Sequence, residues 1–92
     1  MKKIVILPSF ERSIRRFTPV EKNRLALALE KFNDFLVTGR IFSRLGFKKI
    51  GYDIYEFRID IRLRVIVKDE GDTLYMVLAG SHEDIKRYLK SI

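Results

Sequence analysis

Three side chains in this 92-residue chain could act together on an anionic group: Glu56, Arg64 and His82. An arginine guanidinium presents a planar fork of donors that matches phosphate. An imidazole can give or take a proton near neutral pH, and a carboxylate can serve as a base. These residue types therefore favour a phosphate-bearing target.

Each of the three also has a plainer structural interpretation. His82, the single histidine, would lie in the first turn of the final helix and could be an ordinary surface residue there. Glu56 could pair with Arg58 or Arg64, and exposed ion pairs of this kind contribute little to stability. Tyr88 is a further candidate for catalysis or stacking, although its apolar helical neighbours favour a half-buried packing role.

We expect neither a metal nor a cofactor, because the chain has no cysteine and its one histidine lacks a carboxylate cluster at ligand spacing. The lack of cysteine is compatible with the cytosol. The apolar run near the N-terminus is too short for a signal peptide. No apolar stretch approaches the roughly 20 residues of a membrane span. We therefore expect a cytoplasmic protein with no membrane partner.

The strands that must position these residues follow from apolar periodicity. Residues 55–68, YEFRIDIRLRVIVK, alternate with a period of two. This pattern predicts two strands, joined near Asp60, with one face buried and one in water. The buried face would carry Tyr55, Phe57, Leu63, Val65 and Val67. The wet face would carry Glu56, Arg58, Arg62 and Arg64.

Three further strands are expected at residues 3–7, 47–50 and 73–79. The first is almost entirely apolar, which predicts a strand buried on both faces. The last is apolar on both faces, which predicts a central strand. The strand at 47–50 carries Lys48 and Lys49. Turns are expected at 51–53 and 69–72.

Three helices complete the pattern, and each has a residue suited to capping its N-terminus: Ser9, Thr18 with Glu21, and Ser81 with Asp84. Gly39 is expected to end the second helix, with a loop over 40–46. The order β-α-α-β-β-β-β-α predicts an α+β fold with a mostly antiparallel sheet. The first two helices would form a hairpin on one sheet face, and the other face would stay open.

Composition indicates one domain over residues 1–92, because no linker-like tract or repeat interrupts the chain. Lys and Arg number 19 against 12 Asp and Glu, which gives a net charge of +7. A net charge this positive favours the binding of polyanions such as nucleic acid or acidic protein segments. The alternative is that the excess of basic residues merely keeps the protein soluble.

The element order, the segment YEFRIDIRLRVIVK and the ending LYMVLAGSHEDIKRYL resemble the RelE/ParE superfamily of toxins from type II toxin–antitoxin systems. The likeness is most specific at Glu56-Phe57-Arg58-Ile59, at Arg64-Val65-Ile66 and at Gly80-Ser81-His82. The last of these is similar to YafQ-type members. The resemblance implies a small, metal-independent ribonuclease that enters the ribosomal A site and cleaves mRNA with the 2′-hydroxyl as nucleophile.

The resemblance also implies residue roles. Arg64 would stabilise charge on the phosphate, His82 would be the acid or base, and Glu56, as in YoeB-like members, would be the partner base. Lys48 and Lys49 would contact the RNA backbone. Arg58 and Arg62 would attract RNA or pair with carboxylates. Tyr88 is placed against the C-terminal tyrosine of the family.

The implied partners are mRNA, the ribosome and an acidic antitoxin that folds on binding. The superfamily also contains ParE-like gyrase poisons, so a gyrase-inhibiting toxin and an inactive homologue that only binds RNA or antitoxin remain alternatives. The nuclease interpretation expects Glu56 and Arg64 on the helix-free face, within about one phosphate's reach of His82.

Overall fold

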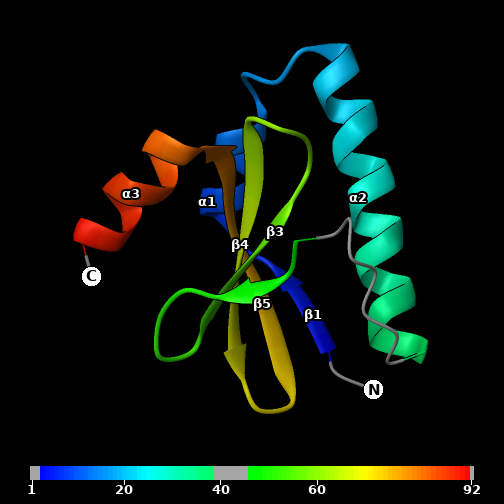
Figure 1. The fold of residues 1–92 in the computed structure, drawn as a ribbon, viewed down its shortest axis with the longest axis vertical. Helices are drawn as coiled ribbons and strands as arrows, with labels where there is room; N and C mark the ends of the chain where they lie inside the picture. Colours follow the sequence, from blue (N-terminus) through cyan, green and yellow to red (C-terminus); the bar gives the residue numbers. More distant parts are fainter. Residues whose placement is uncertain (1–2, 39–45, 92) are drawn as a thin grey trace.

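A computed structural model describes residues 3–38 and 46–91 (Figure 1). The elements are β1 (Lys3–Ile6), α1 (Pro8–Ile14), α2 (Pro19–Thr38), β2 (Lys48–Lys49), β3 (Ile54–Arg58), β4 (Leu63–Glu70), β5 (Thr73–Ser81) and α3 (His82–Lys90). This confirms the α+β class and the predicted order. The helix end expected at Gly39 and the loop expected after it, up to residue 45, lie outside the described residues. Within 3–38 and 46–91, no helix is long and apolar enough to cross a bilayer.

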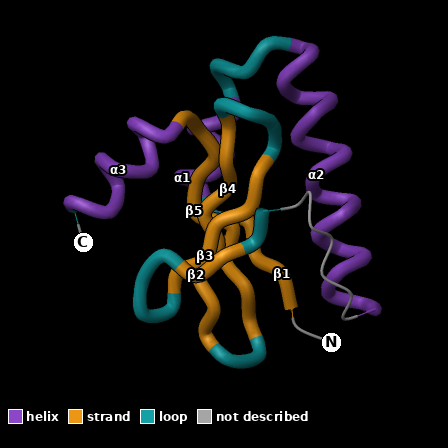
Figure 2. The backbone as a smooth tube through the Cα atoms, in the orientation of Figure 1, coloured by secondary structure: helices purple, strands orange, loops and turns teal. Residues whose placement is uncertain are grey.

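The strands form one twisted sheet in the order β1-β5-β4-β3-β2 (Figure 2). The β1 and β5 strands pair in parallel, and the other neighbouring pairs are antiparallel. The parallel pairing is possible because two helices separate β1 from the later strands. As its apolar sequence predicted, β5 lies inside the sheet, although the middle position belongs to β4.

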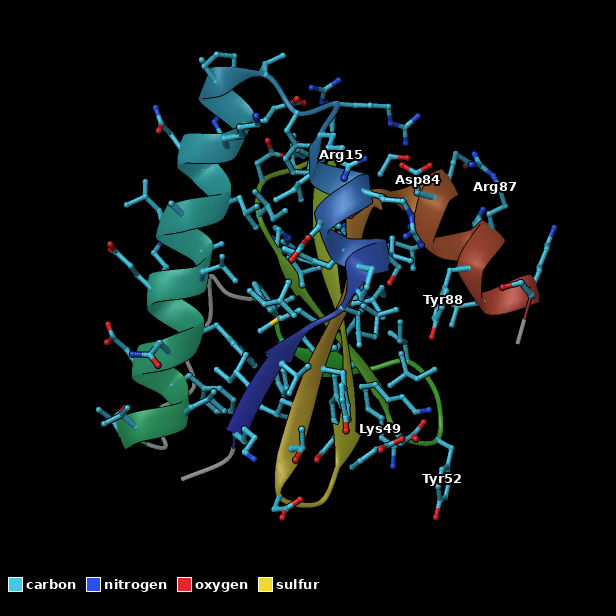
Figure 3. All side chains as sticks on the ribbon, turned by 180° about the vertical axis from the view of Figure 1, so that it is seen from behind. Arg15, Lys49, Tyr52, Asp84, Arg87 and Tyr88 are labelled. Atoms are coloured by element: carbon cyan, nitrogen blue, oxygen red, sulfur yellow. The ribbon has the colours of Figure 1, made fainter. Side chains whose placement is uncertain are left out.

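The helix α2 covers one face of the sheet, and Phe10 of α1 contributes to the same core. The helix α1 itself lies beside the edge of β5, between α2 and α3 (Figure 3), so the expected hairpin of two helices on one face is wrong. Phe32 of α2 stacks on Phe57 of β3, with ring centroids 4.6 Å apart and an interplanar angle of 11°. Both side chains are fully buried. The residues that the alternating pattern assigned to this face, Phe57, Val65 and Val67, belong to this core.

The first strand differs from its prediction. Ile4 and Ile6 of β1 are 39% and 51% exposed, because β1 is the edge of the sheet and not a strand buried on both sides. A continuous apolar run does not distinguish a buried strand from a short edge strand.

The helix α1 continues the edge of the sheet where β1 ends. Ser9 Oγ donates to the carbonyl oxygen of Val77 at 2.5 Å, and the N–H of Ala79 donates to Ser13 Oγ at 2.9 Å. Ser9 is therefore not the helix cap that the sequence suggested. Leu7 occupies the cap position, without a side-chain hydrogen bond, and Pro8 begins the helix.

The second face of the sheet is not fully open, contrary to the sequence-based expectation. Ile85 of α3 packs there against Ile54, Ile66 and Val77. The cause is the apolar stripe of α3, which needs a surface on which to bury itself. Arg64 lies on this face, beside the start of α3.

Candidate functional site

Arg64 lies near the centre of the sheet at the end where α3 begins. In the strand register it is opposite Arg58 of β3 on one side and opposite Gly80 of β5 on the other. Its side chain is half-buried, and within the described residues no carboxylate pairs with it. Cross-strand neighbours project to the same face, and the Asp84 side chain fills the space over Gly80, because a Cβ added at Gly80 would lie 2.6 Å from Asp84 Oδ2.

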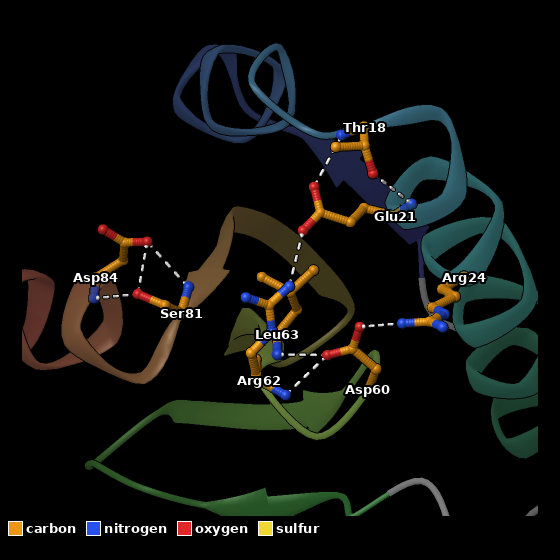
Figure 4. Close-up of polar contacts among 8 residues, drawn as sticks. All are labelled: Thr18, Glu21, Arg24, Asp60, Arg62, Leu63, Ser81 and Asp84. Atoms are coloured by element: carbon orange, nitrogen blue, oxygen red, sulfur yellow. Dashed lines mark hydrogen bonds and ion pairs between the residues drawn. The ribbon is translucent and has the colours of Figure 1, made fainter.

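His82 directly follows β5 and lies at the same end of the sheet as Arg64, two residues after Gly80. His82 is exposed and is the first residue of α3. A complete capping box fixes this helix start (Figure 4): Ser81 N–H donates to Asp84 Oδ2 at 2.9 Å, and Asp84 N–H donates to Ser81 Oγ at 3.3 Å. This confirms the predicted cap. The structure therefore brings Arg64 and His82 to neighbouring backbone positions.

The same capping contacts set the charge of Asp84. The hydrogen bond from the Ser81 N–H lowers the pKa of Asp84, and the Ser81 hydroxyl and the nearby Arg87 and Arg16 add to this effect against the opposing influence of partial burial. Asp84 is thus held as a carboxylate, and its negative charge is favourable at the N-terminus of α3 because of the helix dipole.

Glu56 is placed differently from its prediction. It is only 5% exposed, and its Oε1 lies 3.3 Å from Lys48 Nζ, so its ion-pair partner is Lys48 and not Arg58 or Arg64. The two residues are directly opposite each other in the β2–β3 register. In the β3–β4 register Glu56 is opposite Ile66, which lies two residues from Arg64 along β4 and on the same face of the sheet. The base role for Glu56 stays a prediction, and it requires the carboxylate to leave Lys48.

The other arginines of the expected wet face are associated with α2. The Arg58 side chain lies against Gly46, where an added Cβ would be 3.5 Å from Arg58 Cβ, and it lines a pocket with Arg24 and Lys31 of α2. Arg62 Nη2 is 3.5 Å from Glu21 Oε2, at the start of α2. Arg58 and Arg64 are opposite each other in the strand register, as the expected wet face requires, whereas Arg62 lies in the β3–β4 connection beside α2 and is not part of that row.

Asp60 holds this connection, and the sequence interpretation gave it no role (Figure 4). Its Oδ1 accepts from the N–H groups of Arg62 and Leu63, both at 2.8 Å, and its Oδ2 accepts from Arg24 Nη1 at 3.1 Å. Partial burial acts to raise the pKa of Asp60, but these hydrogen bonds outweigh it and the pKa is lowered. An aspartate three residues before the start of a strand is the available signal, because its side chain can accept from the following backbone N–H groups.

The remaining candidates lie apart from Arg64 in two places. Lys49 Nζ is 6.0 Å from the centroid of the exposed Tyr52 ring, in the turn that follows β2. Tyr88 is half-buried on α3 and packs against the second core. Among the residues that the structure describes, no three His, Cys, Asp or Glu side chains are grouped to hold a metal ion.

No protein-family model matches this sequence, and a search of curated proteins finds no match. Solved structures do match. A chain of the RelB–RelE antitoxin–toxin complex from Methanococcus jannaschii has a TM-score of 0.69 at 17% identity, covering 91% of this chain and 96% of that one. YafQ from Escherichia coli has a TM-score of 0.66 at 10% identity, with 92% and 98% covered. A metal-bound toxin from Helicobacter pylori has a TM-score of 0.67 at 20% identity, with 92% and 99% covered.

These matches extend over nearly the whole of each chain, and they include both a toxin by itself and toxins in complex with antitoxins. At such low sequence identity the shared property is the arrangement of helices and strands. The chain therefore has the fold of the RelE-like toxins.

Proposed function

We propose that this chain is the toxin of a type II toxin–antitoxin system and that it cleaves mRNA in the ribosomal A site. The observation that carries the proposal is the arrangement at the end of the sheet, where Arg64 has no carboxylate partner within the described residues and His82 begins a capped helix two residues after Gly80. The net charge of +7 and the fold of the RelE-like toxins support it.

In the proposed reaction the 2′-hydroxyl of the RNA attacks the adjacent phosphorus, and the bond from phosphorus to the 5′ oxygen breaks. Arg64 stabilises the negative charge that develops on the phosphate oxygens. His82 transfers a proton at the reacting oxygens, with Glu56 as the partner base. Lys48, Lys49, Arg58 and Arg62 would hold the RNA backbone by charge. Tyr88 would stack on or assist the substrate. The chemistry needs no metal or cofactor.

The proposed partners are mRNA on the ribosome and an acidic antitoxin. RelB and DinJ are the antitoxin components of the similar solved complexes. An acidic, partly disordered chain that folds on binding would complement the positive charge of this protein. The toxin would act in the cytoplasm, where translation takes place.

Growth arrest tests the proposal. Induced wild-type protein should stop growth and deplete full-length mRNA, whereas Arg64→Ala and His82→Ala should do neither. Lys22→Ala, an exposed change on α2, is the matched control and should behave as wild type. Arrest by both variants at wild-type strength would refute the nuclease proposal. Arrest with intact mRNA and altered DNA supercoiling would indicate a gyrase poison instead.

A further inference from the structure

A pocket of about 400 Å³ lies between α2 and the connection from β3 to β4. Its apolar lining comes from Leu27 and Ala28 of α2 and from Ile59 and Ile61 of the connection. Leu27 and Ile61 are 57% and 88% exposed. Two large apolar side chains that face water at one pocket form a surface that gains free energy when a ligand covers it. The volume falls within the roughly 300–1,000 Å³ of ligand sites.

The connection that forms one wall of the pocket is held in place by Asp60 (Figure 4). Its Oδ1 accepts from the N–H groups of Arg62 and Leu63, and its Oδ2 accepts from Arg24 of α2 at 3.1 Å. Both oxygens of the one carboxylate in the lining are therefore engaged. Because these contacts already order the backbone on both sides of Ile61, binding there costs little further conformational entropy.

The charge that remains available in the pocket is positive. Lys31 and Arg58 also line it, and within the described residues neither has a carboxylate partner. Arg58 is opposite Arg64 in the β3–β4 register, which places their Cα atoms roughly 5 Å apart. The pocket is therefore adjacent to Arg64 through a shared basic residue.

This combination distinguishes between two kinds of anionic ligand. An unpaired nucleotide offers a phosphate to the cations and a flat base to the apolar walls, and a base gains affinity when it lies between apolar side chains. A helix of a partner protein is about 10–12 Å across with its side chains, which is too wide for a pocket of this volume. The continuity with Arg64 also favours a nucleotide strand, because its phosphates repeat along the chain.

We propose that this pocket takes up the base of one unpaired nucleotide next to the phosphate that Arg64 binds. The inference rests on the proposed function for the identity of the strand as RNA. Leu27 and Ile61, on opposite walls, would hold the base, and Arg58 would bind the phosphate that joins it to the cleaved nucleotide. They would be positioning residues that contribute to the choice of cleavage site, since none of them would touch the reacting atoms.

Fluorescence anisotropy with an RNA that cannot be cleaved tests the pocket. The probe is a fluorescein-labelled 2′-O-methyl RNA of about eight nucleotides, which lacks the attacking hydroxyl, together with copies that carry one abasic site at each position in turn. The pocket variant is Leu27→Ala with Ile61→Ala. The matched control is Val20→Ala with Val37→Ala, two residues of α2 that are 57% and 56% exposed and lie outside the pocket. Circular dichroism verifies that both variants fold.

At one position of the RNA, an abasic site should weaken binding to the wild-type protein about fivefold or more. The pocket variant should bind the intact RNA more weakly by a similar factor. The same abasic site should then cost the pocket variant less than about twofold, because the base and its pocket form one interaction that either change removes. The control should behave as wild type with every probe.

An abasic penalty of the same size in wild type and pocket variant would overturn the proposal, as would equal losses of affinity in pocket variant and control, or no RNA binding by wild type. A third probe is a fluorescein-labelled peptide of leucines at helical spacing among glutamates. If the pocket variant loses affinity for this peptide while its RNA affinity is unchanged, the pocket belongs to a protein partner and the proposal is wrong.

The outcome is independent of the nuclease proposal, because the probe cannot be cleaved. A base-dependent contact in a protein that cuts no mRNA would refute the proposed nuclease function and leave the pocket assignment intact. Cleavage of mRNA by a protein that shows no abasic penalty would refute the pocket assignment alone.

Discussion

Gly80 is the residue at which the geometry of the proposed site can be perturbed most directly. A Cβ added there would lie 2.6 Å from Asp84 Oδ2, 2.9 Å from Asp84 Cβ and 3.1 Å from Asp84 Cγ. The Asp84 carboxylate cannot withdraw freely, because it accepts from both the N–H and the hydroxyl of Ser81. Gly80→Ala should therefore break the capping box of α3.

The expected cost follows from three effects. Loss of the cap costs about 1–2 kcal/mol, and residual overpacking costs about 1 kcal/mol. Replacing glycine by alanine also lowers the conformational entropy of the unfolded chain, which stabilises the folded state by about 0.5–1 kcal/mol. The net loss in free energy of unfolding is about 1.5 kcal/mol, which for a chain of this size lowers Tm by roughly 6–12 °C. Urea and thermal unfolding followed by circular dichroism would measure both quantities.

A double-mutant cycle tests whether the clash is the cause. Asp84→Ala removes the carboxylate that a Cβ at position 80 would meet at 2.6 Å, leaving the contact with Cβ at 2.9 Å. In that background Gly80→Ala should cost at least about 1 kcal/mol less than in wild type. If Gly80→Ala costs the same in both backgrounds, the clash with Asp84 does not explain the destabilisation and the reasoning is refuted.

Two further changes test other parts of the fold. Ser13→Ala leaves the N–H of the buried Ala79 without its acceptor, so it should lower the free energy of unfolding by about 1–3 kcal/mol in urea titrations; an unchanged midpoint would contradict the role of α1 at the sheet edge. Asp60→Ala should cost about 2 kcal/mol at pH 7, because two backbone N–H groups lose a carboxylate acceptor. The folded-state pKa of Asp60 lies below its ordinary value of 3.8, so its contribution is fully present above about pH 4 and is lost as the pH falls through the folded pKa. The difference between wild type and Asp60→Ala should therefore narrow below about pH 4, and a constant difference down to pH 2 would count against this account.

Local sequence signals predicted the features that depend on neighbouring residues. The capping boxes of Thr18 with Glu21 and of Ser81 with Asp84 both form, because each needs only a fixed spacing of three residues. The alternation over 55–68 assigned Phe57 and Val65 to the buried face for the same reason.

Features that depend on the pairing of distant segments were not predictable in this way. The pairing of Glu56 with Lys48 follows from the β2–β3 register, which the turn between the strands sets. The edge position of β1 follows from the order of strands in the sheet and not from its own composition. Arg62 departs from the row of Arg58 and Arg64 because Asp60 holds the β3–β4 connection close to α2, a contact across 36 residues.

The predictions for the candidate site divide in the same way: those that depend on neighbouring residues were met, and those that depend on distant segments were not. The sequence predicted that His82 lies in the first turn of the final helix and that Arg64 lies on the face away from the long second helix, and the structure places both there. It predicted Glu56 as accessible, but the strand register gives Glu56 a lysine partner and buries it. The pocket between α2 and the β3–β4 connection had no sequence signal, because its walls come from segments that are distant in the chain.

The central claim is that Arg64 and His82 cleave mRNA on the ribosome. Primer extension on an mRNA translated in a purified system, with and without ribosomes, tests it most directly. Wild-type protein should produce cuts at A-site codons only when ribosomes are present, and Arg64→Ala and His82→Ala should produce none while retaining the wild-type circular dichroism spectrum. Uncut mRNA with the wild-type protein, or unchanged cutting by both variants, would contradict the claim.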